Sequence, residues 1–191
     1  MGDLAAMRMA IELLHSPARV RVARTEPLPE GVQLVLRVAA GEQEAEREAA
    51  EWTGQSSCIL RQAAAFYIEH ILLSAESDAY RVLGSTPYAS PADLRRNLAF
   101  LLKWVHPDLQ ENKDRSAFLK RVTGAWEEVK TPDRRHAYDA TLIAAAAQMP
   151  TSSAAEMRRP HRPPPPARPQ RKPPLVTRLV GLARALLVRT R

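Results

Sequence analysis

Apolar residues recur with helical spacing in two neighbouring stretches of the chain. Ser90 suits a helix N-cap and Pro91 the first helical position, so a helix is predicted from Pro91 to about Val105. One side of it carries Leu94, Leu98, Leu101, Leu102 and Val105. The same spacing recurs in Phe118, Val122, Ala125, Trp126 and Val129. Two such helices joined by a proline-containing loop predict an antiparallel hairpin in which the apolar sides of the two helices pack against each other.

The first 75 residues are predicted to be mostly helical. The segment from Ser56 to Leu73 is apolar around much of its circumference, which predicts a helix buried on more than one side. The segment from Glu42 to Trp52 predicts an amphipathic surface helix with Trp52 at a core position. Val32 to Val38 fits either a short strand or a buried helix. Ala18 to Glu30, which lies among prolines, is predicted to be extended or a loop.

Proline sets the last part of the chain apart. Residues 149–174 contain nine of the sixteen prolines, which predicts a stiff, disordered linker without a core. Leu175 to Arg191 then predicts a basic amphipathic helix with leucines and valines on one side. Candidate contacts with an anionic membrane surface are Arg178, Arg184, Arg189 and Arg191. The alternative to membrane contact is that this helix docks in a partner's groove or on the N-terminal domain, and the pattern favours neither.

The positive charge belongs to this tail. Residues 157–191 contain ten Arg or Lys and no Asp or Glu, which leaves 18 basic and 21 acidic residues before them. The body therefore lacks the basic stripe of a nucleic-acid-binding domain, and binding of nucleic acid by the tail alone is the weaker alternative. Cys58 is the single cysteine, which excludes a disulfide within the chain and a cysteine-based zinc site. A single cysteine suits a reducing compartment, so a cytoplasmic location is expected. The terminal basic helix adds the alternative of a peripheral position at the inner membrane face.

A short motif lies in the loop of the predicted hairpin, and it has a characteristic context. His106-Pro107-Asp108 follows the first hairpin helix, and Asp78 to Gly84 and Ala89 precede that helix. Phe118 to Val129 and Arg134 to Asp139 follow the motif. In this order, over about a third of the chain, these segments resemble the J-domain family of DnaJ-like co-chaperones. The resemblance implies a non-enzymatic protein that recruits a DnaK-type chaperone and stimulates its ATP hydrolysis, with no cofactor, metal or small-molecule substrate of its own.

The resemblance also implies the residues that contact the chaperone. They are His106, Pro107, Asp108, Arg95, Arg96 and Lys103. Pro107 keeps the loop out of helical geometry, and Asp108 suits a charge-assisted bond to an arginine of the partner. An acid–base catalytic role for His106 and Asp108 is disfavoured, because no nucleophile or metal cluster is placed near them.

The first hairpin helix departs from the family on its basic face. Positions that are basic or tyrosine in J-domains here hold Leu98, Ala99, Phe100 and Trp104. Phe100 and Trp104 lie one turn apart, on the face predicted to be opposite the leucines. They are predicted to be covered by the N-terminal helices, above all 56–73, or to bind a partner, and the remaining alternative is that they are scattered surface residues without a role. The second reading gives an alternative function, a J-like adaptor that holds a partner without stimulating ATP hydrolysis.

The sequence as a whole predicts an all-α chain. A helical N-terminal domain is expected over residues 1–75 and a four-helix J-domain with the antiparallel hairpin over 76–141. A disordered linker rich in proline and arginine is expected over 142–174, and the terminal amphipathic helix over 175–191.

Overall fold

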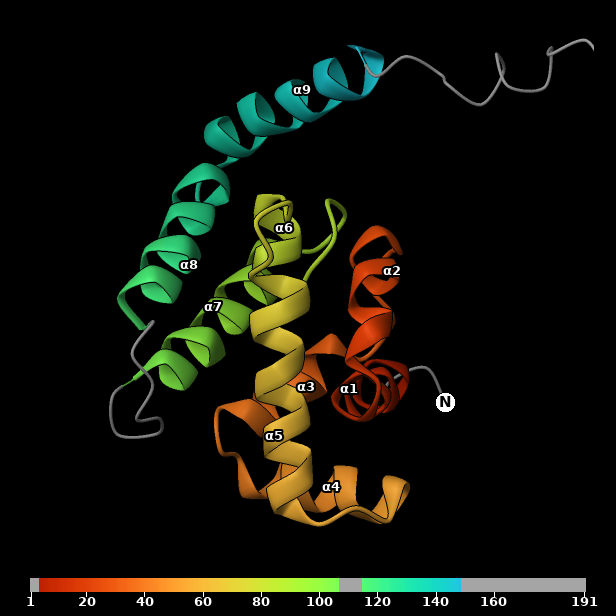
Figure 1. The fold of residues 1–191 in the computed structure, drawn as a ribbon. Coiled ribbons are helices and arrows are strands. Elements are labelled where there is room, and N and C mark those ends of the chain that lie inside the picture. The colour runs from red at the N-terminus through yellow and green to blue at the C-terminus, as the bar shows by residue number, and fades with distance from the viewer. Residues whose placement is uncertain (1–3, 107–114, 149–191) are drawn as a thin grey trace, which may run out of the picture. The chain divides into compact units, whose positions relative to one another are not determined.

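The computed structural model describes residues 4–106 and 115–148, and this part of the chain consists of helices and turns without a strand (Figure 1). The all-α prediction is therefore confirmed for these residues. The helices are α1 (Ala5–His15), α2 (Val20–Thr25), α3 (Val32–Ala39), α4 (Gln43–Thr53), α5 (Ser57–Tyr67), α6 (Ala79–Val82), α7 (Pro91–Val105), α8 (Arg115–Val129) and α9 (Pro132–Gln148). The predicted terminal helix and most of the predicted linker lie outside the described residues. None of the described helices is long and apolar enough to cross a membrane.

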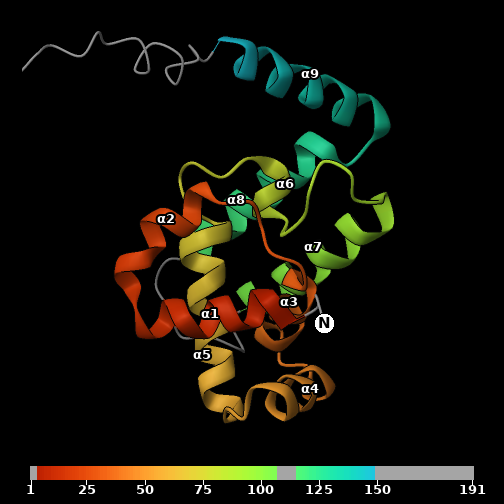
Figure 2. The same ribbon diagram turned by 90° about the vertical axis from the view of Figure 1, so that its right-hand side faces the viewer.

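Helix α5 is the centre of the N-terminal half, as predicted. Ser56 caps it by accepting a bond from the Ile59 N–H at 3.5 Å. The helix continues into a π-helical turn, Ile68–Leu72. It packs against α1, α3 and α4, and Figure 2 shows α1 lying across it. Its side chains Leu60, Tyr67, Ile68 and Ile71 are fully buried.

Two predictions for the N-terminal half were wrong. The stretch 18–30 is not all extended, because Pro17 opens a 3₁₀ turn (Pro17–Arg19) that leads into α2. Proline is compatible with the first helical position, where its missing N–H costs nothing. Trp52 is 62% exposed and not in the core. The buried residues of α4 are Ala45, Glu46 and Ala49, and Trp52 lies outside this face, in the last turn before the C-cap Gly54. The ambiguous segment 32–38 is helix α3.

Helices α7 and α8 form the predicted hairpin. Ser90 accepts a bond from the Asp93 N–H at 3.1 Å, and α7 starts at Pro91 as the capping residues indicate. The two helices pack against each other and run in opposite directions (Figure 1). Helix α6 packs on α8, and α9 follows α8. Helix α9 continues to Gln148, past residue 141, where the linker was predicted to begin.

The buried face of α7 differs from the face predicted from its leucines and Val105. Trp104 is 2% exposed and Asn97 is 5% exposed, whereas Leu102 is 38% exposed. Trp104 is thus not on an outer face opposite the leucines, and that placement was wrong. The spacing of the leucines and the valine does not include Asn97, which the structure buries on the same face as Trp104. Of the N-terminal helices, α3 makes the main contact with α7, and not the segment 56–73.

The N-terminal helices and α6–α9 belong to one compact unit. Gly84, just after α6, has a φ of +61°, which favours glycine. It also packs closely on α3, because a Cβ added at Gly84 would lie only 2.9 Å from Cγ1 of Val32. Arg81 on α6 donates from Nη1 to the Glu26 carbonyl at 2.8 Å and from Nη2 to the Ala23 carbonyl at 2.9 Å. These acceptors lie at and just after the end of α2, where carbonyls lack helical partners. The contacts join the start of the hairpin region directly to α2 and α3.

Candidate functional site

The first residue of the His-Pro-Asp motif lies at the end of α7. His106 is the C-cap of this helix, with extended backbone angles (φ −60°, ψ 138°), and its N–H donates to the Lys103 carbonyl at 3.2 Å. The residue is exposed. An extended residue before proline is the expected conformation, because the proline ring disfavours the helical region for the residue that precedes it. Pro107 and Asp108 lie outside the described residues.

The predicted cationic residues of α7 lie on its solvent side. Arg95, Arg96 and Lys103 are all exposed, and Ala99 and Leu102 lie among them. Arg96 pairs with Asp93 at 3.4 Å, with both side chains about half exposed. Such a surface pair contributes little to stability, so Arg96 can exchange this partner for another carboxylate at low cost. The solvent side of α7 therefore combines a reduced positive charge with some apolar surface beside His106.

A buried amide fixes the orientation of α7. The Asn97 side chain donates from Nδ2 to the Leu83 carbonyl at 3.0 Å and to the Gly84 carbonyl at 3.2 Å. Because a buried amide without partners would be costly, these bonds select one rotation of α7 about its axis. That rotation points Arg95 and Lys103 to solvent. Asn97 was not among the predicted residues, although a lone asparagine among apolar helix positions is the signal that could have indicated it.

An aromatic pair connects the two ends of the segment that carries the motif. The rings of Trp104, in the last turn of α7, and Phe118, in the first part of α8, have centroids 5.7 Å apart. Trp104 Nε1 is buried and has no hydrogen-bond partner among the described residues. The indole therefore contributes through packing. Its place just before His106 makes it a support for the motif and not a contact for a partner.

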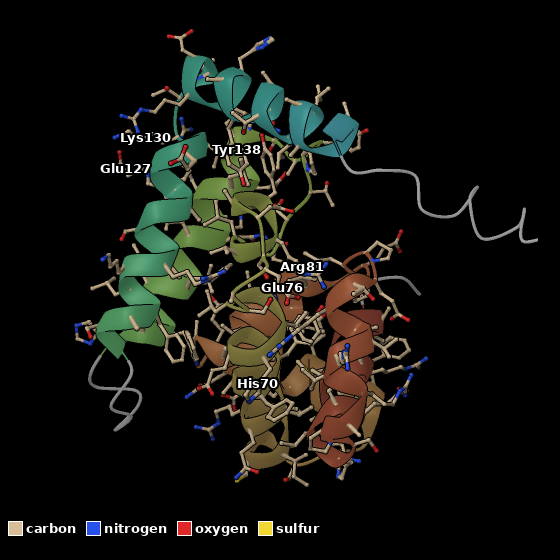
Figure 3. All side chains as sticks on the ribbon, turned by 45° about the horizontal axis from the view of Figure 1, so that its top comes forward. His70, Glu76, Arg81, Glu127, Lys130 and Tyr138 are labelled. Atoms are coloured by element: carbon tan, nitrogen blue, oxygen red, sulfur yellow. The ribbon has the colours of Figure 1, made fainter. Side chains whose placement is uncertain are left out.

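Side chains of the segment Arg134 to Asp139 connect α9 to α6 through hydrogen bonds. The Tyr138 hydroxyl accepts from the Ala79 N–H at 2.8 Å, and Figure 3 shows Tyr138 between the two helices. The Tyr80 hydroxyl donates to Asp139 Oδ1 at 2.6 Å and accepts from Arg135 Nε at 3.1 Å. Arg135 also donates to the Ala89 carbonyl at 2.9 Å, in the loop before α7. The closing signature thus has a structural role: it ties α9, α6 and the loop that starts α7.

This network predicts a specific loss of stability in alkali. Burial and the bond to Asp139 raise the pKa of Tyr80 from 10.0 to about 12. The pKa is higher in the folded chain than in the unfolded chain, so the contribution of Tyr80 is complete below about pH 10 and is lost as the pH rises toward about 12. Tyr80→Phe is expected to lower the free energy of unfolding by about 1 kcal/mol near pH 8 and to make its decline above pH 10 shallower. Urea unfolding followed by circular dichroism at several pH values measures both.

The control for this experiment is Tyr88→Phe, because Tyr88 is 96% exposed. Burial also raises the pKa of Tyr67 and of Tyr138. Both tyrosines therefore add to the alkaline decline of every variant, and only the difference from the unmodified chain reports Tyr80. A decline of the same slope in Tyr80→Phe and in the unmodified chain would contradict the role given to the bond with Asp139.

The turn between α8 and α9 carries a charged cluster. Glu127 Oε2 lies 2.8 Å from Lys130 Nζ and 3.3 Å from Arg134 Nη1. Figure 3 labels Glu127 and Lys130 at the end of α8. The hydrogen bond from Lys130 lowers the pKa of the Glu127 carboxyl group. All three groups are solvent-exposed or nearly so, so the cluster helps to define the turn and adds little stability. Within residues 4–106 and 115–148 no three His, Cys, Asp or Glu side chains are arranged to bind a metal ion.

Comparison with known proteins agrees with this geometry. Residues 78–139 match the family model of the DnaJ domain, which covers α6, α7, α8 and the first half of α9. Residues 78–139 are a J-domain. The resemblance predicted from the motif and its flanking segments is confirmed. The J-domain family consists of co-chaperones and not of enzymes.

The similar proteins share only this domain with the chain. The chaperone protein DnaJ of Rickettsia akari is 37% identical over 62 residues, which are 32% of this chain and 17% of that protein. The chaperone protein DnaJ of Latilactobacillus sakei is 36% identical over 67 residues, 35% of this chain and 18% of that protein. The match thus spans less than a fifth of the length of these relatives. No solved structure matches the chain.

Proposed function

We propose that this protein is a co-chaperone that recruits a DnaK-type chaperone and stimulates its ATP hydrolysis through His106, Pro107 and Asp108. The observation that carries the proposal is a J-domain in which the motif begins at the exposed end of α7. The exposed cations Arg95, Arg96 and Lys103 lie on the same helix. The nucleotide belongs to the partner, so the chain supplies contacts and no cofactor.

In the proposed contact, α7 attracts the chaperone and the His-Pro-Asp motif forms the specific bond. Positive side chains on α7 attract an acidic surface of the chaperone and orient the encounter. Asp108 then forms a charge-assisted bond with an arginine near the nucleotide-binding domain, which is stronger and more directional than a neutral hydrogen bond. Pro107 keeps the preceding residue out of helical geometry, and His106 is exposed at the end of α7. Asn97 and Trp104 support this arrangement from the buried side of α7.

The adaptor alternative depends on an open apolar face formed by Phe100 and Trp104. Trp104 is 2% exposed, and Phe100 is partly buried against the core. Neither ring offers a large surface to a partner, and no observation favours the adaptor over the co-chaperone. Contact within the chain is the reading that the burial of these two residues supports.

The remaining parts of the chain complete the proposal. We propose that either residues 1–75 or the tail selects the client or the location. Residues 142–174 then connect the J-domain to the terminal helix, with the connection beginning after α9 ends at Gln148. In this proposal the protein is cytoplasmic, and residues 175–191 lie at an anionic membrane surface with Arg178, Arg184, Arg189 and Arg191 near the headgroups.

The function is tested by the ATPase rate of a DnaK-type chaperone in the presence of the full chain. Stimulation is expected with the unmodified protein and is expected to fall at least about tenfold for His106→Gln and for Asp108→Asn, because each removes a contact worth about 1.5 kcal/mol or more. His136→Gln is the matched control, since His136 is an exposed histidine on α9 away from the motif. Equal rates with the unmodified chain and with His106→Gln would exclude the proposed mechanism.

A further inference from the structure

A groove of about 700 Å³ lies along α8 on the side of the segment that leads from the π-helical turn into α6. It is mostly apolar and open to solvent. Its apolar walls include Leu73, Ala79, Ala117, Phe118, Ala125 and Tyr138. None of its lining residues belongs to α7, so the groove is distinct from the cationic face proposed to meet the chaperone.

Gly124 forms part of this groove and has no packing reason to be a glycine. It lies in the interior of α8, where glycine destabilises a helix by about 0.5–1 kcal/mol relative to alanine. A Cβ added there would meet no atom within 4 Å, and the backbone φ is not in the left-handed region. The space above Gly124 is therefore not filled by the described residues. A glycine in such a position allows another backbone to approach the helix closely.

The rim of the groove carries charges of opposite sign. Two neighbouring cations of α8, Lys120 and Arg121, line the groove. Glu128 also lines it, eight residues after Lys120, which is about 12 Å further along the helix. Lys120 and Glu128 are exposed, and neither forms an ion pair with another described residue. Arg121 donates to the Ser74 carbonyl, and its Nε is buried without a hydrogen-bond partner among the described residues. The rim of the groove is thus positive near Lys120 and Arg121 and negative near Glu128.

We propose that this groove binds an extended, apolar polypeptide segment of another protein. An acidic side chain of the segment pairs with Lys120 and Arg121, and a basic side chain about four residues away pairs with Glu128, since an extended chain advances about 3.3 Å per residue. The apolar side chains between them lie on the walls, and the backbone of the segment passes over Gly124. A mostly apolar channel with charges of opposite sign about 12 Å apart suits a peptide better than a compact small molecule, which needs convergent polar groups.

The test uses the full chain and a fluorescein-labelled peptide of leucines flanked by an aspartate and a lysine. Binding is followed by fluorescence anisotropy. Gly124→Leu fills the groove and is expected to weaken binding at least about tenfold, while its melting temperature stays equal or rises because leucine is the better helix former. Thr123→Leu is the matched control, because it adds the same side chain to an exposed position of α8 outside the groove. It is expected to leave the affinity within about twofold of the unmodified chain, a small difference in free energy.

A charge exchange tests the polarity of the site independently. Lys120→Glu is expected to weaken binding of the aspartate-containing peptide, and a peptide with lysine in place of that aspartate is expected to recover affinity for this variant. Absence of binding by the unmodified chain at about 1 mM peptide, which corresponds to about −4 kcal/mol, overturns the proposal. Equal binding by Gly124→Leu and the unmodified chain overturns it as well. Because neither peptide assay involves a chaperone or ATP, failure here leaves the proposed co-chaperone function to its own test.

Discussion

Trp104→Ala is expected to lower the free energy of unfolding by about 3–5 kcal/mol, the range for a fully buried aromatic side chain. Trp104 is 2% exposed and lies against Phe118, at the point where α7 and α8 approach the motif-bearing segment. Removing the indole leaves a cavity that the hairpin can close only by shifting one of the helices. The urea midpoint of the circular dichroism signal measures the loss. We expect the variant also to lose ATPase stimulation, because the ends of the motif-bearing segment are no longer held together.

Two matched substitutions make this result specific. Trp52→Ala removes the same side chain from a position that is 62% exposed, and it is expected to change the free energy of unfolding by no more than about 0.5 kcal/mol. Trp104→Phe keeps an aromatic ring and removes the buried, unpaired N–H, so it is expected to cost less than about 1.5 kcal/mol. Similar losses for Trp52→Ala and Trp104→Ala would show that the packing of Trp104 is not what stabilises the hairpin.

The J-domain is expected not to fold when it is separated from the N-terminal helices. A fragment of residues 76–148 would lack α3, which packs on α7, and the Ala23 and Glu26 carbonyls that Arg81 binds. Its helix α6 is a single short turn, Ala79–Val82, and short helices need tertiary packing to form in water. We expect low helical content by circular dichroism and no cooperative urea transition for this fragment.

The control for the fragment is residues 1–148, which retains every described helix. This longer fragment is expected to show a single cooperative transition, because its helices form one compact unit. If residues 76–148 unfold as cooperatively as residues 1–148, the contacts of Gly84 and Arg81 with α2 and α3 add little, and the J-domain is independent of the N-terminal helices.

Local signals in the sequence were sufficient where a helix boundary depends on a few neighbouring residues. Ser90, Pro91 and Asp93 defined the start of α7, because capping depends on side chains adjacent to the helix end. Ser56 similarly precedes α5. The motif and its flanking segments indicated the J-domain because their order and spacing are specific. The contacts of Arg135, Tyr80 and Asp139 could not be predicted in the same way, since they join residues more than fifty positions apart.

Predictions failed where burial depends on the neighbouring element. The leucine spacing on α7 did not show that α3 and α8 together cover a face that includes Asn97 and Trp104. Leu102 was placed with the buried leucines, but it is 38% exposed because it lies beyond that face. Trp52 shows the same difficulty at a helix end. Helical periodicity gives the relative positions of side chains around an axis, whereas the rotation of the axis is set by distant contacts such as those of Asn97 with the Leu83 and Gly84 carbonyls.

The direct packing of α3 on α7 determines how the N-terminal helices can act. Two modules joined by a flexible tether meet their ligands with an effective concentration that depends on the length of the tether. Here no tether intervenes, because Gly84 and Arg81 join the two parts through side-chain and backbone contacts. Any molecule bound by α1–α5 is held in one orientation relative to His106. In the proposed function, a client bound by the N-terminal helices would therefore reach the chaperone in one fixed orientation.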